Sequence, residues 1–303
     1  MPPTGGEGYD ELALVRDLAT ELGVDPGRRT VERVEWRDGG RRVSGLRWGP
    51  GEPRLVLLHG GSLNAHSWDA MLLMTDLPAV ALDLPGHGRS SWFDEPLYLP
   101  ADVAGAVAPA VAALAPGARA VAGHSLGGLA ALAMAAHRPE LVPRLVLVDA
   151  TPGSTPDRSQ DILDFVSAAE FDSFEAFVDH AAAHRPGGDR GRLRRSLRHN
   201  ARRRDDGTWT WRHDGRDHPT RDRWEVVFEE LPKGWAHAEA VRCPALLLRG
   251  ERSPIVTDGD VERYRRAIPH LRVEVIAGAG HNIHGDRPGA LGAAIAGFLE
   301  AAA

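Results

Sequence analysis

The sequence predicts an α/β fold, in which a mostly parallel sheet is covered by helices. From about Thr30 to Gly123, short apolar runs alternate with turn residues and with longer Ala/Leu-rich stretches. This alternation of strand-like and helix-like segments is typical of a parallel sheet built from βαβ units. The same rhythm resumes at Pro244 and continues towards the C-terminus. We therefore expect one sheet whose strands come from both parts of the chain.

The first part of the chain supplies a hairpin and three buried strands. Two runs that alternate polar and apolar residues flank Asp38-Gly39-Gly40, which predicts a hairpin at the edge of the sheet. The runs that follow are continuously apolar, as expected for strands buried on both faces. In order, the expected elements are strands at 30–36, 41–48, 54–58 and 79–82, a helix at 101–114 and a strand at 118–122.

The second part of the chain completes the sheet. A helix that begins after Ser125 is expected to stop at about His137, because Pro139 follows. Beyond it, the expected elements are strands at 144–148, 244–249 and 272–276 and helices at 258–268 and 288–302.

Residues 151–235 differ from the rest of the chain, because aromatic residues are scattered through them and no strand-like apolar run appears. We therefore predict a core formed by residues 1–150 and 236–303, interrupted by an inserted helical cap. Arginines crowd the stretch from 190 to 204. A solvated cap helix is the favoured interpretation, since two leucines four residues apart would share one apolar face; an anion-binding or substrate-recruiting surface is the alternative.

The composition is that of a soluble globular protein, with 43% hydrophobic and 26% charged residues among 303. A net charge of -6 does not favour binding to nucleic acid or to an anionic membrane. The single cysteine, Cys243, cannot form an internal disulfide, which suggests a reducing compartment. Because the N-terminus lacks a secretory pattern and no apolar run approaches the roughly 20 residues of a bilayer span, we expect a cytoplasmic protein.

Ser125 is the predicted nucleophile. Residues 123–128 read Gly-His-Ser-Leu-Gly-Gly, directly after a buried strand and at the start of an Ala-rich helix. Gly-x-Ser-x-Gly in this context is a nucleophile elbow, where the serine lies on a sharp strand-to-helix turn and the glycines allow close backbone approach. The helix N-terminus would then face the oxyanion that forms during the reaction.

A serine hydroxyl near neutral pH needs a neighbouring base, and His281 is the predicted one. It lies in Gly-Ala-Gly-His, residues 278–281, directly after the last strand and so at the carboxyl edge of the sheet with Ser125. His284 is its nearest rival. A buried histidine with a purely structural role is the other alternative.

The oxyanion would be held by two backbone N–H groups. Leu126, which follows the nucleophile, supplies the first. For the second, Gly61 is preferred and Ser62 is next, because residues 57–62 (Leu-Leu-His-Gly-Gly-Ser) follow a strand and their glycines allow an N–H to point into a pocket. A plain Gly-Gly turn is the alternative.

Taken together, these motifs resemble the α/β-hydrolase family over residues from about 30 to the C-terminus. The resemblance includes His-Gly-Gly at 59–61, the Asp-Leu-Pro-Gly-His-Gly-Arg-Ser loop at 83–90, and the segments around Ser125 and His281. It implies an eight-stranded, mostly parallel sheet sandwiched by helices, with a helical cap between the sixth and seventh strands. In the family, the loop at 83–90 is mainly a structural turn.

The acid member of the triad departs from the commonest family pattern, which places an aspartate shortly after the seventh strand. Ser253 occupies that position here, and a serine cannot carry the negative charge that orients the histidine. The favoured replacement is Asp149 at the tip of the sixth strand, where some relatives carry their acid, although such a residue often only caps a turn. Asp258 and Glu251 are the alternatives, and Asp258 also resembles a helix N-cap.

Several residues are candidates for the substrate pocket. Ser62, His124, Trp68 and Trp211 are predicted to line it, although Trp68 could equally anchor the core and Trp211 could pack the cap. No His/Cys/Asp/Glu cluster has metal-ligand spacing along the chain, and no dinucleotide motif follows a first strand, so we expect neither a metal nor a cofactor.

The predicted function is a serine hydrolase that cleaves a small-molecule carboxylic ester or lactone through an acyl-serine intermediate. Carbon–carbon bond hydrolases and cofactor-free peroxidases use the same triad and are alternatives. A serine at position 125 argues against epoxide hydrolases and haloalkane dehalogenases, which use an aspartate there. The alternative from another class is a non-catalytic small-molecule receptor, which only the serine at position 253 favours. The sequence does not indicate which oligomeric state the protein adopts.

Overall fold

An eight-stranded sheet forms the centre of the structure, a computed structural model that describes residues 9–25, 27, 29–167, 170–184, 189–215 and 221–301. The strand order is β1-β2-β4-β3-β5-β6-β9-β10. β1 and β2 form an antiparallel hairpin, β2 runs antiparallel to β4, and the other neighbours are parallel. The strands are β1 Val31–Asp38, β2 Arg41–Trp48, β3 Leu55–Leu58, β4 Ala79–Leu82, β5 Ala120–His124, β6 Leu145–Val148, β9 Ala245–Gly250 and β10 Arg272–Ile276. The predicted sheet is therefore confirmed.

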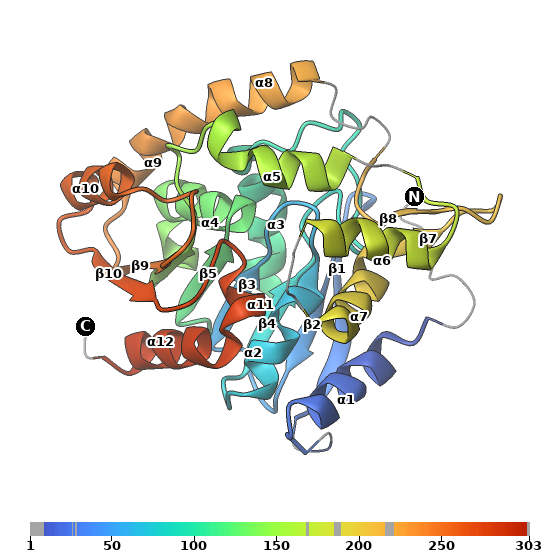
Figure 1. The fold of residues 1–303 in the computed structure, drawn as a ribbon. Helices are drawn as coiled ribbons and strands as arrows, with labels where there is room; N and C mark the ends of the chain where they lie inside the picture. Colours follow the sequence, from blue (N-terminus) through green and yellow to red (C-terminus); the bar gives the residue numbers. More distant parts are fainter. Residues whose placement is uncertain are drawn as a thin grey trace.

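Helices cover both faces of this sheet (Figure 1). Because successive side chains of a strand point to opposite faces, Val56 and Leu58 of β3 join one apolar layer and Leu55 and Leu57 join the other. The first layer includes α3 (Pro100–Leu114), α4 (Leu126–His137), α9 (Gly234–Ala240) and α10 (Asp258–Ala267). The second includes α1 (Glu11–Glu21), α2 (Asp69–Leu73), α11 (Ile283–Asp286) and α12 (Pro288–Glu300).

Residues 151–235, the predicted cap, lie between β6 and β9 and contain helices and a short hairpin. The elements of this segment that precede α9 are α5 Pro156–Ser167, α6 Phe174–Ala183, α7 Arg190–Asn200, β7 Ala201–Arg203, β8 Trp209–Trp211, α8 Arg221–Glu230 and the 3-10 turn η3 Leu231–Lys233. Their own apolar cluster includes Phe174, Phe177 and Trp211. The end of the predicted segment, at residue 235, falls inside α9, which packs on the core helix α4.

The arginine-rich stretch is helical only as far as Asn200, because the next residues pair with β8 as β7. Leu197 is buried in the cap cluster and Leu193 packs against it, as the four-residue spacing predicted. Four arginines of α7 form ion pairs, namely Arg190 with Asp179, Arg192 and Arg195 with Glu21, and Arg194 with Glu175. These contacts favour the interpretation of α7 as a solvated, ion-paired cap helix.

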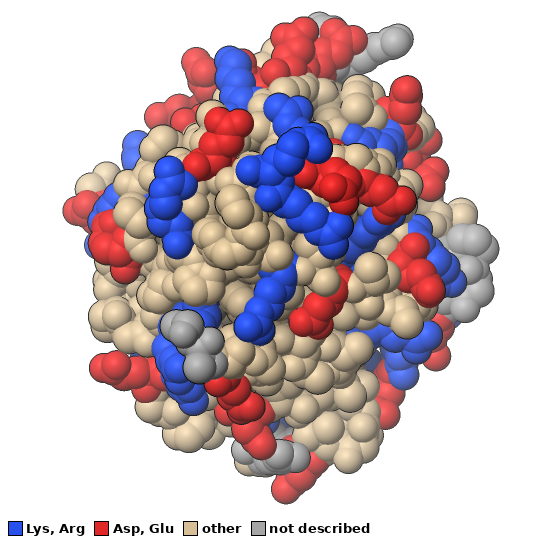
Figure 2. Space-filling view, turned by 90° about the vertical axis from the view of Figure 1, so that its left-hand side faces the viewer, with Lys and Arg blue, Asp and Glu red and all other residues tan. Residues whose placement is uncertain are grey.

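Charges of both signs are mixed on the face of the molecule that lies to the left in Figure 1. Figure 2 shows Lys and Arg interspersed with Asp and Glu over this face, with no large area of one sign. Within the described part of the chain, no helix combines the length and the apolar character needed to cross a bilayer.

A buried ionic network ties the N-terminal helix and the loop after β4 to the edge of the sheet. Arg33 of β1 donates to Asp83 at 2.8 Å and to Glu11 of α1 at 2.6 Å. Asp83 is only 1% exposed and also accepts from the backbone N–H groups of Ala65 and Arg89. Although burial alone would raise the pKa of Asp83, Arg33 and these donors lower it overall.

Replacing Asp83 with Asn should lower the free energy of unfolding at pH 7 by about 3 kcal/mol, because one partner of a buried ion pair is removed. A carboxyl group with a lowered pKa stabilises the fold above its unfolded-state pKa of about 3.9 and loses that contribution as the pH falls through its folded-state pKa. The deficit of the variant should therefore shrink only below about pH 4. Urea unfolding at pH 7 and at pH 3 measures both effects.

Glu32→Gln is the matched control. The Glu32 side chain is 67% exposed, and its ion pair with Arg47 is long, at 3.8 Å. It should change stability by less than about 0.5 kcal/mol. Equal losses in the two variants would show that the Asp83 network does not stabilise the fold.

Candidate active site

Ser125 lies on the sharp turn between β5 and α4. Its φ and ψ angles are 49° and -118°, a conformation that is uncommon for a residue with a side chain. The flanking glycines make this turn possible, because a Cβ at Gly123 would lie 2.1 Å from the Gly127 carbonyl oxygen, and one at Gly127 would lie 2.4 Å from the Leu58 carbonyl oxygen. The local geometry is that expected of a nucleophile elbow.

Asp149 lies beside this turn because β5 and β6 are parallel neighbours. The register pairs His124 with Val148, and the Ser125 N–H donates to the Val148 carbonyl at 3.1 Å. Asp149 follows Val148 directly and, like Ser125, has a positive φ, of 48°. The two residues therefore leave adjacent strands at the same edge of the sheet.

His281 reaches Asp149 from the loop after β10. Its Nδ1–H donates to Asp149 Oδ2 at 2.7 Å. The Asp149 carboxylate is fully buried and also accepts from the Gly250 N–H at 2.9 Å and from the Ser253 hydroxyl. Ser253, which occupies the family's usual acid position, thus supports the carboxylate from the loop after β9.

The alternative carboxylates do not reach His281. The Asp258 side chain is 93% exposed and pairs with Arg249. Glu251 is also exposed and accepts from the Gly278 N–H. Asp149 is therefore the carboxylate that contacts the predicted base.

Ser125 and His281 line the same cavity, and no hydrogen bond joins the Ser125 hydroxyl to His281 Nε2 in the described part of the chain. Such bonds are often long before substrate binds and tighten in the reacting complex. His124, next to the serine, donates through Nε2 to the His281 carbonyl at 3.0 Å, which fixes the loop that carries the base. Burial, followed by the proximity of His281 and His284, holds the pKa of His124 well below 6.5.

The two predicted oxyanion donors also face this cavity. Gly61 and Leu126 both line it, and among the described residues neither of their N–H groups has a hydrogen-bond acceptor. The Ser62 N–H, by contrast, donates to His87 Nε2 at 3.0 Å. This bond separates the two candidates for the second donor, because only the Gly61 N–H is available.

Two buried histidines form the support beneath this loop. His59 donates to the Gly60 carbonyl and accepts from the Leu84 N–H, while His87 donates to the Pro85 carbonyl. Burial, then the nearby His87, lowers the pKa of His59 to about 3, so its ring is neutral over the physiological range. These rings hold neighbouring loops together and take no part in the reaction proposed below.

The cavity has a volume of about 870 Å³ and is bounded by the core on one side and the cap on the other. Of the predicted pocket residues, Ser62, His124 and Trp211 line it. The prediction for Trp68 is wrong, because this side chain is fully buried in the apolar layer formed with α2 and α12. The cap contributes apolar side chains to the wall, among them Ile162, Phe165, Leu193, Trp224, Val227 and Phe228.

Comparison with known proteins agrees with this arrangement. The family model described as the alpha/beta hydrolase fold matches residues 53–288. The chain belongs to the α/β-hydrolase fold family. This α/β hydrolase is 38% identical over 301 residues to the esterase Rv0045c of Mycobacterium tuberculosis, covering 97% of each chain. It is also 29% identical over 264 residues to the sn-1-specific diacylglycerol lipase ABHD11 of Xenopus laevis, covering 82% of this chain and 80% of the lipase.

Solved structures show the same likeness. A structure of the M. tuberculosis esterase, described in connection with transition metal inhibition of that protein, superimposes with a TM-score of 0.83 at 39% identity. It covers 97% of this chain and 100% of the esterase. The thioesterase domain from the curacin pathway, at 21% identity and a TM-score of 0.72, covers 88% of this chain and 99% of that domain and shares the fold. The chain is thus an enzyme of the α/β-hydrolase family.

Removing the Ser253 hydroxyl should weaken the support of Asp149. Because a hydrogen bond to a charged group contributes about 1.5–3 kcal/mol, Ser253→Ala should lower the free energy of unfolding by about 2 kcal/mol at pH 7. The matched control is Ser167→Ala, whose exposed hydroxyl donates to the Asp164 carbonyl. Chemical denaturation of both variants compares the two bonds, and equal effects would contradict a buried, charged acceptor at residue 149.

Proposed function

We propose that this protein is a serine hydrolase that cleaves a small-molecule carboxylic ester or lactone through an acyl-serine intermediate. The observation that carries the proposal is the His281–Asp149 hydrogen bond beside Ser125, at the wall of one large cavity. A serine on a strand-to-helix turn, a histidine oriented by a buried carboxylate, and two free N–H groups are the components that acyl transfer needs.

In the proposed mechanism, His281 Nε2 accepts the proton of the Ser125 hydroxyl while the serine oxygen attacks the substrate carbonyl carbon. The resulting oxyanion accepts hydrogen bonds from the Gly61 and Leu126 N–H groups. The Asp149 carboxylate holds the tautomer with a proton on Nδ1 and stabilises the imidazolium that forms.

The intermediate then collapses and the bond to the leaving alkoxide breaks, with His281 returning the proton to the departing alcohol. Water attacks the acyl-serine in the same way, giving its proton to His281, and the carboxylic acid leaves as Ser125 regains its proton. In a lactone the alcohol and the acid are two ends of one product.

The cavity wall supports an ester with a substantial apolar part. Core residues near Ser125 supply the polar groups, whereas the cap presents Phe165, Trp224 and Phe228. Burial of an apolar chain against such side chains is favourable by about 25 cal/mol per Å². The naming of the M. tuberculosis relative as an esterase, and of the Xenopus relative as a lipase, agrees with this substrate class.

The contacts of Asp149 also bear on the receptor alternative. That alternative depended on the serine at position 253, which left the triad without its usual acid. In the structure Asp149 contacts both His281 and Ser253, so a carboxylate is present where the mechanism needs one. This favours a catalytic protein.

Ser125→Ala should abolish covalent labelling by a fluorophosphonate probe and reduce the hydrolysis of p-nitrophenyl esters by at least about 10³-fold, because the nucleophile is removed. Labelling is followed by mass spectrometry of the intact chain, and hydrolysis by absorbance on a panel of esters and lactones. Ser167→Ala, an exposed serine of the cap, is the control and should behave as the wild type. A folded wild-type protein that takes no label, or a Ser125→Ala variant that keeps its activity, would refute the proposal.

Asp149→Asn should lower kcat/KM by about 10³–10⁴-fold, because the amide favours the wrong histidine tautomer. Asp258→Asn is the matched control and should stay within about twofold of the wild type, since that carboxylate is exposed. Adding Ser253→Asp to the Asp149→Asn variant should raise kcat/KM at least about tenfold above that of the single variant, because a carboxylate returns to the same part of the site. Full activity of Asp149→Asn would contradict its role as the acid.

A further inference from the structure

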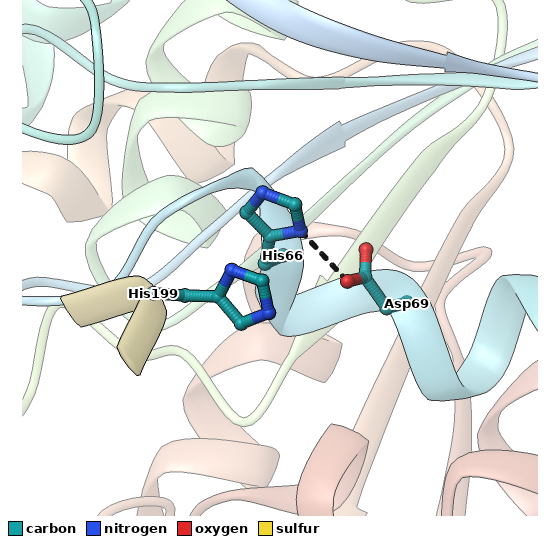
Figure 3. Close-up of side chains that lie close together, drawn as sticks. All are labelled: His66, Asp69 and His199. Carbon is teal, nitrogen blue, oxygen red and sulfur yellow. Dashed lines mark hydrogen bonds and ion pairs between the residues drawn. The ribbon is translucent and has the colours of Figure 1, made fainter. Parts of the chain in front are cut away.

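A second polar cluster lies in the wall of the cavity, away from Ser125. It consists of His66 in the 3-10 turn η1 (Ala65–Trp68), Asp69 at the start of α2, and His199 near the end of α7. Figure 3 shows the two imidazole rings on the same side of Asp69. One ligand atom from each residue can be chosen so that all three lie within 4.8 Å of one another. The spacing along the chain did not predict this cluster, because the fold brings His199 of the cap to the core.

We propose that His66, Asp69 and His199 form a binding site for a divalent transition-metal ion that joins the cap to the core. Two imidazole nitrogens and one carboxylate suit Zn²⁺, Co²⁺ or Ni²⁺ better than Mg²⁺ or Ca²⁺, which prefer oxygen ligands. His66 and Asp69 are three residues apart on one helical turn and therefore present their ligand atoms on one side.

The outer nitrogens of both rings already have partners of the kind found around metal-bound histidines. The nitrogen of His66 that would ligate the ion is Nδ1, which now hydrogen-bonds Asp69 Oδ2 at 2.7 Å and would release its proton when the ion binds, while its Nε2 lies 3.3 Å from Glu11 Oε2. His199 Nδ1 lies 2.9 Å from the Tyr9 hydroxyl, which leaves Nε2 for an ion. A carboxylate or hydroxyl on the second nitrogen fixes the orientation of a ligating ring and increases its basicity.

Asp69 supplies an independent reason for an ion at this place. Its side chain is buried, and its Oδ1 has no hydrogen-bond partner among the described residues. A buried carboxylate oxygen without a donor is costly, and a bound cation would offset that cost.

The arginines near the cluster are engaged elsewhere. Arg33 lies 3.4 Å from His66 Nε2, but it is paired with the carboxylates of Glu11 and Asp83. Arg212 donates to the backbone carbonyls of His199 and Ala201. Both guanidinium groups therefore have acceptors other than Asp69.

Metal binding would require one imidazole ring to turn. The His66 and His199 rings are stacked, with centroids 3.7 Å apart and an interplanar angle of 19°, whereas a ligating nitrogen directs its in-plane lone pair at the ion. Because all three residues also line the large cavity, an ion could enter from it and a water molecule could complete the coordination.

The test uses the full chain, treated with a chelator and then titrated with Zn²⁺ by calorimetry, and with Co²⁺ by visible absorption. All proteins carry His137→Gln and His237→Gln, because the Nε2 atoms of this surface pair lie 3.1 Å apart and could bind metal themselves. The parent protein should bind one Zn²⁺, melt at a higher temperature with it, and bind no Mg²⁺ under the same conditions.

Two variants remove ligands from different elements, His199→Gln from the cap and Asp69→Asn from the core. Each should weaken Zn²⁺ binding at least about tenfold and remove the Co²⁺ absorption band, while circular dichroism shows that the protein remains folded. If one variant fails to fold, the other decides the matter. Unchanged Zn²⁺ affinity in a folded variant, or no Zn²⁺ binding by the parent protein, would overturn the proposal.

Discussion

The parallel pairing of β5 with β6 is the constraint on which the candidate active site depends. Its register places the residue after each strand at the same edge of the sheet, so that Ser125 and Asp149 emerge side by side. The backbone N–H groups of both residues donate to the next strand, at the Val148 and Leu248 carbonyls respectively. Ser125 and Asp149 are therefore held by hydrogen bonds at the edge of the buried sheet, whereas His281 comes from the loop after β10.

The sequence was sufficient to predict the parts of the site that follow strands directly. Ser125 and Asp149 each come directly after a buried strand, and parallel strands end at a common edge, so their proximity follows from the sheet. The boundaries of the eight strands differ from those expected by at most two residues. The strands could be predicted this well because buried strands have a simple apolar pattern and sharp turns at both ends.

Other features depend on contacts between segments that have no pattern in common. The helix α1 was not expected, and it is positioned by the ion pair of Glu11 with Arg33 as well as by its apolar face. Trp68 was placed in the pocket, although it turns into the core. Sequence spacing could not show that His66 would meet His199, since that contact requires the cap to fold back on the core. The direction in which a loop side chain points is a property of packing and not of local sequence.

Three residues other than glycine have a positive φ within the described part of the chain, and all of them lie at the cavity wall: Ser62, Ser125 and Asp149. Each such conformation costs about 1–3 kcal/mol relative to a relaxed backbone. The surrounding sheet must compensate for this cost. Substitutions that relax the backbone at these positions would stabilise the fold, but they would also disturb the geometry on which turnover depends. Thermostabilised versions of the protein are therefore better sought through substitutions on the outer helices than around the candidate active site.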